Sequence, residues 1–510
     1  MKKRFLLFIS LLTLSSCSLS LEDFFPSIEF PFLSSSSATS FTASKEFGDN
    51  YYQPDKLKYT LQDINSQVNW VTSESVGNQK MLIVPVQLSS GTSWTTTMLN
   101  TIDDVFFGES SDTTFESVQS YFLKSSYNTL NIGGAVTDVF KSKYTKSDIV
   151  NATKNGYTCS DLIAEEFYNS SNASLLKEYD VNKDGFVDNC VFIYSNNYAS
   201  GSSSKAEQNS FWAWCTYYDY QSNSTKPSIN NYMWASYNFI NDGYSFYNNN
   251  KPDAHTFIHE TGHLLGLDDY YCYDDKNAWD CAGQLDMQSY NVGDHNIYSK
   301  MALGWVKPYV VTDSASITLK TSALYPQAIL INDSWNGSAF DEYIIIEYYT
   351  PQGLNKMDSE YNFNGREKMY NFNGLRIYHV DTRMTELNVS SEGELSFKGY
   401  TDDIKSTYNS VTYIGSSNST SYSYLNSPYN KVYRLLHLID QGEKNVLNNG
   451  LGGSVSRSSA LWTGGKTFSP SSKYFYNVVK FNDGTDIGYS ISVANLTDEE
   501  CLVTIKKIER

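Results

Sequence analysis

One short segment constrains the fold of this chain of 510 residues more than any other, because it requires a helix followed by a sharp reversal. It carries the pattern His-Glu-x-x-His-x-x-Gly-x-x-Asp, formed by His259, Glu260, His263, Gly266 and Asp269. On an α-helix, side chains four residues apart lie on one face, so His259 and His263 can bind the same ion. Gly266 permits a left-handed turn that returns the chain toward that face.

The side chains of this pattern predict a catalytic zinc site. Two imidazoles and a carboxylate are common zinc ligands, and a catalytic site keeps one position for water, whose pKa zinc lowers to about 7. We therefore expect one zinc ion on His259, His263 and Asp269, with Glu260 as the general base. Asp268 is an alternative third ligand. A surface helix with two solvated histidines is the alternative to any metal site.

Apolar patterning predicts an α+β fold. Residues 81–86 and 190–194 are apolar runs typical of buried strands, and residues 115–123 repeat apolar side chains at helical spacing. The metal segment predicts a helix over residues 253–267. After Trp305, short alternating runs favour an all-β, sandwich-like C-terminal region. The strands expected there are residues 316–319, 342–348, 374–380, 432–438, 488–493 and 502–508.

The metal segment resembles the metzincin metalloproteases, in the variant with Asp as third ligand. More narrowly, it is similar to the immune inhibitor A family of secreted bacterial peptidases, whose pattern continues Gly-Leu-Pro-Asp and then an aromatic residue. In this chain Asp268 stands where that family has proline. The resemblance covers residues 80–505 and is carried also by residues 81–88, 117–128, 285–287, 300–305, 342–347, 374–381 and 436–440.

The resemblance implies a metzincin-like zinc protease catalytic domain, expected over residues 76–306, and the alternating runs after it predict a β-rich domain over residues 307–510. It also implies that Met287 forms the Met-turn, an apolar floor beneath the zinc ligands that does not bind the metal. Many metzincins have a tyrosine two residues after this methionine, whereas Tyr290 follows Met287 by three. Tyr290 is therefore either a transition-state stabiliser or a core residue.

The N-terminus predicts export. A basic start precedes an apolar stretch at residues 5–14 that is too short to span a membrane. Small residues then lead to Cys17 as in a bacterial lipobox, so residues 1–17 are expected to be a lipoprotein signal peptide with Cys17 lipidated; an ordinary secretory signal is the alternative. Residues 18–75 are expected to be a Ser-rich stalk or short pro-segment. We thus expect an extracytoplasmic lipoprotein, anchored to a bacterial membrane by its lipid alone.

The net charge and the cysteines limit which binding partners and which disulfides are expected. The net charge is −18, whereas phosphate contacts need clustered Lys and Arg, so nucleic acid is not expected as a partner. Outside the cytoplasm disulfides are permitted, and Cys272 with Cys281 is the pair expected to close a small loop beside the metal segment. The sequence assigns no pairing to the other cysteines, which are Cys159, Cys190, Cys215 and Cys501.

A second segment has the spacing of calcium ligands. Asp180, Asn182, Asp184 and Asp188 place side-chain oxygens at alternate positions, as at the front of an EF-hand loop. Position twelve of that loop is Val191 instead of the bidentate glutamate. The segment is equally compatible with a calcium ion and with an Asx-rich turn that needs no ion.

The other histidines are not expected to bind the metal. His255 lies one turn before the site and is expected to be solvated or to support a ligand, because a fourth protein ligand would close the site to water. His295 is expected in a loop, where it could contact substrate. His379 and His437 are expected to be structural.

These features together favour a zinc-dependent endopeptidase that acts on extracellular proteins or peptides. Glu260 would take a proton from water and pass it to the leaving amine, while zinc polarises the scissile carbonyl. One alternative is a catalytically inert surface-adhesion protein on the same scaffold, although the intact Glu260 argues against it. The other is a zinc hydrolase with a non-protein substrate.

Overall fold

The computed structural model describes most of the chain between residues 45 and 509. The described residues are 45–65, 73–154, 161–198, 205–217, 220–241, 251–270, 282, 286–289, 292–361, 368–382, 386–389, 395–399, 405–408, 411–414, 436–441, 461–470, 480–481 and 485–509. They form helices and several sheets, so the fold class is α+β. None of the helices in these ranges is long and apolar enough to cross a membrane.

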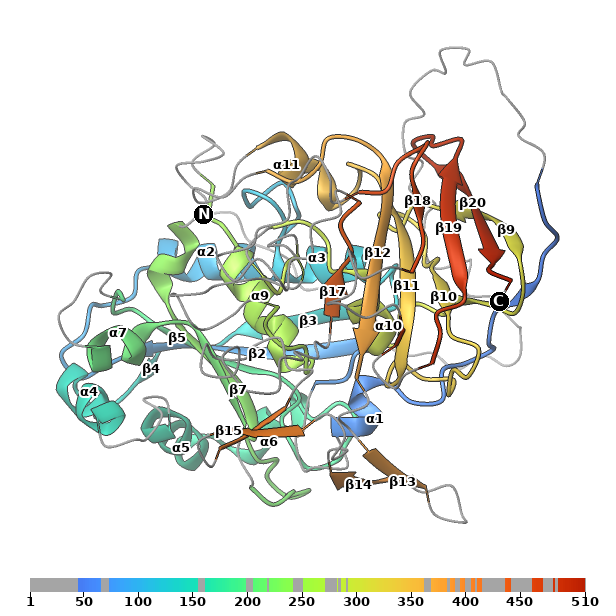
Figure 1. The fold of residues 1–510 in the computed structure, drawn as a ribbon. Helices are drawn as coiled ribbons and strands as arrows, with labels where there is room; N and C mark the ends of the chain where they lie inside the picture. Colours follow the sequence, from blue (N-terminus) through green and yellow to red (C-terminus); the bar gives the residue numbers. More distant parts are fainter. Residues whose placement is uncertain are drawn as a thin grey trace, which may run out of the picture. The chain divides into compact units, whose positions relative to one another are not determined.

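A mixed sheet forms the N-terminal part of the described structure. Its strands are β2 (Gly77–Gln87), β3 (Leu130–Val136), β4 (Phe140–Lys141), β5 (Cys190–Tyr194), β6 (Trp214–Tyr217) and β7 (Asn231–Ser236). The order is β3-β2-β5-β7-β6, with β4 beside β2 (Figure 1). All pairs are parallel except β6 with β7, which places an antiparallel strand at one edge. β5 and β7 are fully buried, as central parallel strands covered on both faces must be.

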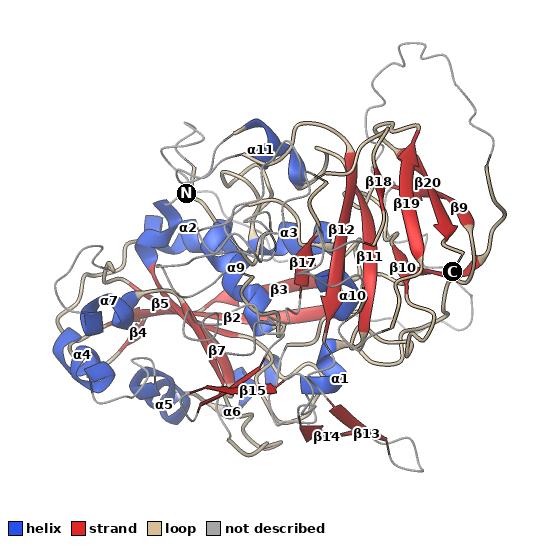
Figure 2. Cartoon of the chain, in the orientation of Figure 1, coloured by secondary structure: helices blue, strands red, loops and turns tan. Residues whose placement is uncertain are grey.

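Helices cover both faces of this sheet (Figure 2). On one face lie α2 (Thr96–Phe107), α3 (Val118–Ser125) and α9 (His255–Leu264), and on the other lie α4 (Lys146–Lys154), α5 (Asp161–Ser170), α6 (Ala173–Glu178) and α7 (Lys205–Phe211). Alternate side chains of β2 enter the two cores: Met81 and Ile83 face α9, whereas Leu82 and Val84 face α5. This two-sided burial explains the unbroken apolar run at residues 81–86.

Helix α3 begins later than its apolar spacing indicates. The prediction started the helix at Phe115, but Ser117 has extended backbone angles and caps the first turn. Its hydroxyl accepts a hydrogen bond from Ser120 N, and Ser120 Oγ accepts one from Ser117 N. This reciprocal cap satisfies two backbone N–H groups at the helix start, so residues 115–117 stay outside the helix.

Two sheets form the C-terminal part. Their strands are β8 (Tyr309–Val311), β9 (Ala315–Lys320), β10 (Ile329–Ile331), β11 (Glu342–Tyr349), β12 (Gly374–Asp381), β17 (Leu436–Leu438), β18 (Thr467–Phe468), β19 (Tyr489–Ala494) and β20 (Glu500–Lys507), joined by β1 (Tyr51–Tyr52). The orders are β1-β8-β10-β11-β12-β17 and β18-β19-β20-β9. The sheets share one apolar core, in which Ile344 and Ile346 of β11 lie with Val503 and Ile505 of β20. This is the face-to-face packing of a sandwich.

A further apolar core joins the C-terminal sheet to the metal segment. Helix α10 (Ile297–Ala302) packs with Tyr343 and Ile345 of β11, and Tyr270 lies in the same core. β11 is therefore buried on both faces, toward the second sheet and toward α10. The chain beyond the metal segment is held in place by the β-rich region.

The remaining described elements are short. They are α1 (Leu61–Asn65), the 3-10 helix Tyr237–Asn241, α11 (Asn355–Glu360), and two hairpins, β13 (Glu386–Val389) with β14 (Leu395–Gly399) and β15 (Lys405–Tyr408) with β16 (Val411–Ile414).

Of the residues expected to form a stalk or short pro-segment, 45–65 and 73–75 are described, and residues 45–65 dock on the β-rich part and do not form a free stalk. β1 adds to the edge of β8, and Lys58 N donates to Gly337 O over 2.8 Å. Leu57 and Tyr59 pack against the core around α10. The open edge of β8 satisfies the backbone of this segment, which therefore docks although its sequence has little periodicity.

Candidate metal centre

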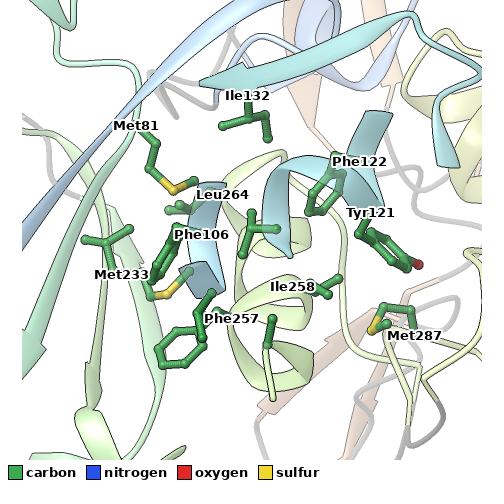
Figure 3. Packing of buried hydrophobic residues seen from close by; sticks show 14 of the residues in the cluster. Met81, Phe106, Tyr121, Phe122, Ile132, Met233, Phe257, Ile258, Leu264 and Met287 are labelled. Atoms are coloured by element: carbon green, nitrogen blue, oxygen red, sulfur yellow. The ribbon is translucent and has the colours of Figure 1, made fainter. Parts of the chain in front are cut away.

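Helix α9 is fixed by the core on one side and presents its histidines on the other. Phe257, Ile258 and Leu264 are buried, and Figure 3 shows them among Met81 and Phe106 of the surrounding core. α9 also contacts α3, β6 and β7. This burial sets the direction in which the polar face of the helix points.

The left-handed turn at Gly266 is present, as predicted. Helix α9 ends at Leu264, three residues before the predicted end of the helix at residue 267. Gly266 has a φ of 97°. Its N–H donates to His263 O over 2.8 Å, and Leu267 N donates to Gly262 O over 3.0 Å. This pair of bonds is a Schellman motif, which ends a helix and redirects the chain. The reversal places Asp269 opposite the histidines.

Three ligand atoms meet at one point. His259 Nε2 and Asp269 Oδ1 are 3.1 Å apart, His263 Nε2 and Asp269 Oδ1 are 3.2 Å apart, and the two Nε2 atoms are 3.2 Å apart. Tetrahedral zinc with bonds of about 2.0–2.1 Å separates its ligand atoms by roughly 3.3 Å. The triangle therefore fits a single zinc ion. Asp268 does not join this group, and its Oδ1 accepts a hydrogen bond from Asp269 N.

The second ring nitrogen of each histidine contacts a backbone carbonyl. His259 Nδ1 lies 2.9 Å from Met287 O, and His263 Nδ1 lies 2.8 Å from Leu267 O. A carbonyl only accepts, so each Nδ1 carries a proton, and each Nε2 would bind a metal ion that displaces any proton held there. Met287 itself is fully buried in the core, consistent with an apolar floor.

The charge balance of the site also suits a cation. Burial alone lowers the pKa of His263, but Asp269 raises it to a net value of about 10, and it raises the pKa of His259 in the same way. Although burial opposes it, the two histidines hold the pKa of Asp269 well below its usual range. The aspartate is therefore ionised and attracts positive charge to the point where the three ligand atoms meet.

Glu260 lies beside this point and is only 7 % exposed. Burial raises the pKa of its carboxyl group, and the neighbouring His263 and His259 lower it. Cys215 of β6 donates from Sγ to the backbone oxygen of Glu260 over 3.1 Å, which ties the sheet edge to this turn of the helix. A buried carboxyl at such a position suits a general base.

Some predicted residues lie elsewhere or outside the described residues. His295 lies in a loop, as expected, but it is 1 % exposed and hydrogen-bonded, so it is not placed to contact substrate. His255 begins α9 but does not belong to the ligand group, and His379 pairs with Glu342 of β11 over 2.8 Å. Cys190, Cys215 and Cys501 are free thiols. The predictions for Cys17, Cys159, Tyr290 and the Cys272–Cys281 pair lie outside the described residues.

Sequence reasoning missed two residues beneath the site. Gln288 donates to the backbone of His259, and Asp286 holds the backbone of Gln288. In the sequence, Asp286 belongs to the stretch 285–287 that resembles the peptidase family, but no role was predicted for it. A buried glutamine has no motif of its own, so only the structure brings Gln288 to the site.

The predicted calcium loop folds as a tight polar turn. Asp180 Oδ2 accepts from Gly185 N, Asn182 Oδ1 accepts from Asp184 N, and Asp188 Oδ2 accepts from Val181 N. Among the described residues, carboxylates of this loop do not approach one another as His259, His263 and Asp269 do. Asp180 Oδ1 is buried without a hydrogen-bond partner. The calcium site stays a prediction.

Asp188 makes this loop sensitive to pH. Burial raises the pKa of Asp188, which is 4 % exposed, from 3.8 to about 7. Because the folded-state pKa is the higher one, the stability that this group contributes is fully present below pH 3.8 and is lost as the pH rises to about 7. We expect Asp188→Asn to raise the free energy of unfolding at pH 8 by about 2–4 kcal/mol, and not at pH 4.

Urea unfolding of both proteins at the two pH values measures this effect. An equal gain at both values would contradict the assignment to ionisation of Asp188. Calcium at pH 8 provides a further comparison: a calcium ion in the loop would raise the melting temperature of the wild type more than that of Asp188→Asn.

Comparisons with known proteins add no identification: no protein-family model matches the chain, and no curated protein matches its sequence.

Proposed function

We propose that the chain is a zinc-dependent, metzincin-like endopeptidase that cleaves extracellular proteins or peptides. The observation that carries the proposal is the triangle of His259, His263 and Asp269, sized for zinc, with Glu260 buried beside it. An adhesion protein has no need of a general base at that position. The export signal and the lipid anchor at Cys17 form part of the same proposal and rest on the sequence alone.

The residues of the chain divide the chemistry among them. When bound, zinc supplies Lewis-acid activation of water and of the scissile carbonyl. Glu260 takes the proton of the attacking water on its carboxylate and returns it to the nitrogen of the leaving amine. The carbonyls of Met287 and Leu267 keep both imidazoles oriented through these steps.

The edge of the N-terminal sheet favours a peptide substrate over a glycan. β6 pairs with β7 and has no second neighbour among the described strands. An extended peptide can add to such an edge through main-chain hydrogen bonds. The edge also passes next to the catalytic helix, because Cys215 of β6 contacts Glu260. A peptide paired with β6 would thus lie close to the proposed base.

Metal removal tests the proposal. Protein purified without residues 1–17 is expected to hold about one zinc per chain and to cleave denatured casein. A zinc chelator should reduce cleavage to background, and added zinc should restore it. Purified protein that contains no zinc would contradict the proposed metal site. Zinc-loaded protein that leaves casein intact but acts on a glycan panel would favour the non-protein hydrolase, and inactivity on both would favour the adhesion protein.

A further inference from the structure

The side chain of Gln288 bridges the metal-binding helix and the polar interior behind it. Gln288 is fully buried, and its Nε2 donates to the backbone oxygen of His259 over 3.2 Å. Its Oε1 lies 3.2 Å from Nε2 of His295, which is also buried. His295 Nδ1 lies 3.1 Å from the hydroxyl of Tyr121 on α3. A continuous chain of buried polar groups therefore leads from α3 to a zinc ligand.

Only one direction of hydrogen bonding satisfies this chain. Burial, with the charge of Lys300, lowers the pKa of His295 well below its usual range, so the ring is neutral and carries one proton. Gln288 Oε1 can only accept, which places that proton on His295 Nε2. Nδ1 is then the acceptor, and it lies 3.1 Å from the Tyr121 hydroxyl, which shares its proton between this nitrogen and Gly293 O, also at 3.1 Å. The Gln288 amide is left to donate to the oxygen of His259, and the opposite amide orientation would set its oxygen against that carbonyl.

The surroundings fit this orientation of Gln288. A Cβ atom at Gly262 would lie 2.2 Å from Gln288 Oε1, so the glycine within the metal motif leaves the space that the amide fills. Asp286 Oδ1 accepts from Gln288 N, and Asp286 Oδ2 accepts from Asn296 N, each over 2.8 Å. The backbone of Gln288 is thereby held by Asp286, which Asn296 also contacts.

Two neighbouring residues hold His259 at two points. Met287 O contacts its ring nitrogen, and the Gln288 side chain contacts its backbone oxygen. The ring contact sets the tautomer and the rotation of the imidazole. The backbone contact fixes the distance between α9 and the turn at residues 286–289, so that the ring contact is made at the correct length.

We infer that Gln288, oriented by His295, is a positioning residue that fixes the zinc ligand His259 against the turn beneath it. This inference rests on the proposed zinc site. Residues that support metal ligands typically change metal affinity by about 10–100-fold when they are lost. The side chain of Gln288 contacts the backbone oxygen of His259 and the ring of His295, so its loss should act on zinc retention and on kcat and leave KM nearly unchanged.

The test compares the rate of zinc release to an excess of chelator in full-length protein. Gln288→Met has nearly the same volume and removes both hydrogen bonds, and it should release zinc about 10–100-fold faster than the wild type. Tyr121→Phe removes only the hydroxyl at the far end of the chain and should accelerate release in the same direction by a smaller factor. It provides a measurement if Gln288→Met does not fold.

A matched control separates positioning from general destabilisation. Tyr348 is a buried tyrosine in the core between the two C-terminal sheets, where its hydroxyl donates to Thr497 O. Tyr348→Phe should lower the melting temperature as Tyr121→Phe does and leave zinc release unchanged. Equal acceleration by both variants, or wild-type release from Gln288→Met, would overturn the inference while leaving the proposed function intact. A wild-type chain without zinc would overturn both.

Discussion

Glu260→Gln is expected to reduce kcat for protein cleavage by about 10³-fold while leaving the zinc content unchanged. Glutamine has the same size and shape as glutamate, so the buried space that the Glu260 side chain occupies stays filled. Its amide cannot accept the proton of the attacking water, and general base catalysis typically contributes about 10²–10⁴-fold. Cleavage of a fluorogenic casein, measured together with zinc content and melting temperature, checks the prediction.

Glu166→Gln is the matched control for this substitution. Glu166 lies on α5, on the opposite face of the N-terminal sheet, where its carboxylate accepts from Ser142 Oγ. The control variant should retain wild-type kcat. A Glu260→Gln enzyme that cleaves casein within a few-fold of the wild type would remove Glu260 from the base role and leave the zinc triad in need of another proton acceptor.

The meeting of His259, His263 and Asp269 was predictable because its geometry is local. The four-residue spacing of His259 and His263 and the left-handed turn at Gly266 depend on helix geometry and on the missing Cβ, not on distant parts of the chain. The strands at residues 190–194 and 342–348 were predictable for a similar reason, since continuous apolar runs indicate burial on both faces.

Features that depend on distant contacts were not predictable from one sequence. Phe47 N donates to the hydroxyl of Ser316 over 2.9 Å across a separation of 269 residues, and no sequence pattern near Phe47 indicates this partner. The segment therefore resembled a stalk. Gln288 shows the same limit, because its role follows from meeting His259 and His295 in three dimensions. The spacing of Asp180 and its neighbours indicated oxygen ligands, but backbone hydrogen bonds occupy several of those oxygens.

Asp269→Asn is expected to weaken zinc binding by more than about 100-fold, which exceeds the usual effect of losing a residue that only supports a ligand. The carboxylate of Asp269 would supply both a ligand oxygen and the negative charge that balances the ion. Asparagine has no charge, and its amide oxygen is a weaker metal ligand. Equilibrium competition with a zinc-binding dye measures the affinity directly, without reliance on catalysis.

Asp268→Asn decides between the two adjacent aspartates that the sequence offers as third ligand. Asp268 is exposed, and its Oδ1 accepts from Asp269 N over 2.9 Å, a bond that an asparagine oxygen can also accept. This variant should therefore bind zinc within a few-fold of the wild type. The opposite ranking of the two variants would mean that the turn after Gly266 delivers Asp268 to the metal, since only one of two adjacent side chains can point there. The charge removed is the same in both variants, so a difference in zinc affinity reports ligation and not the general electrostatics of the loop.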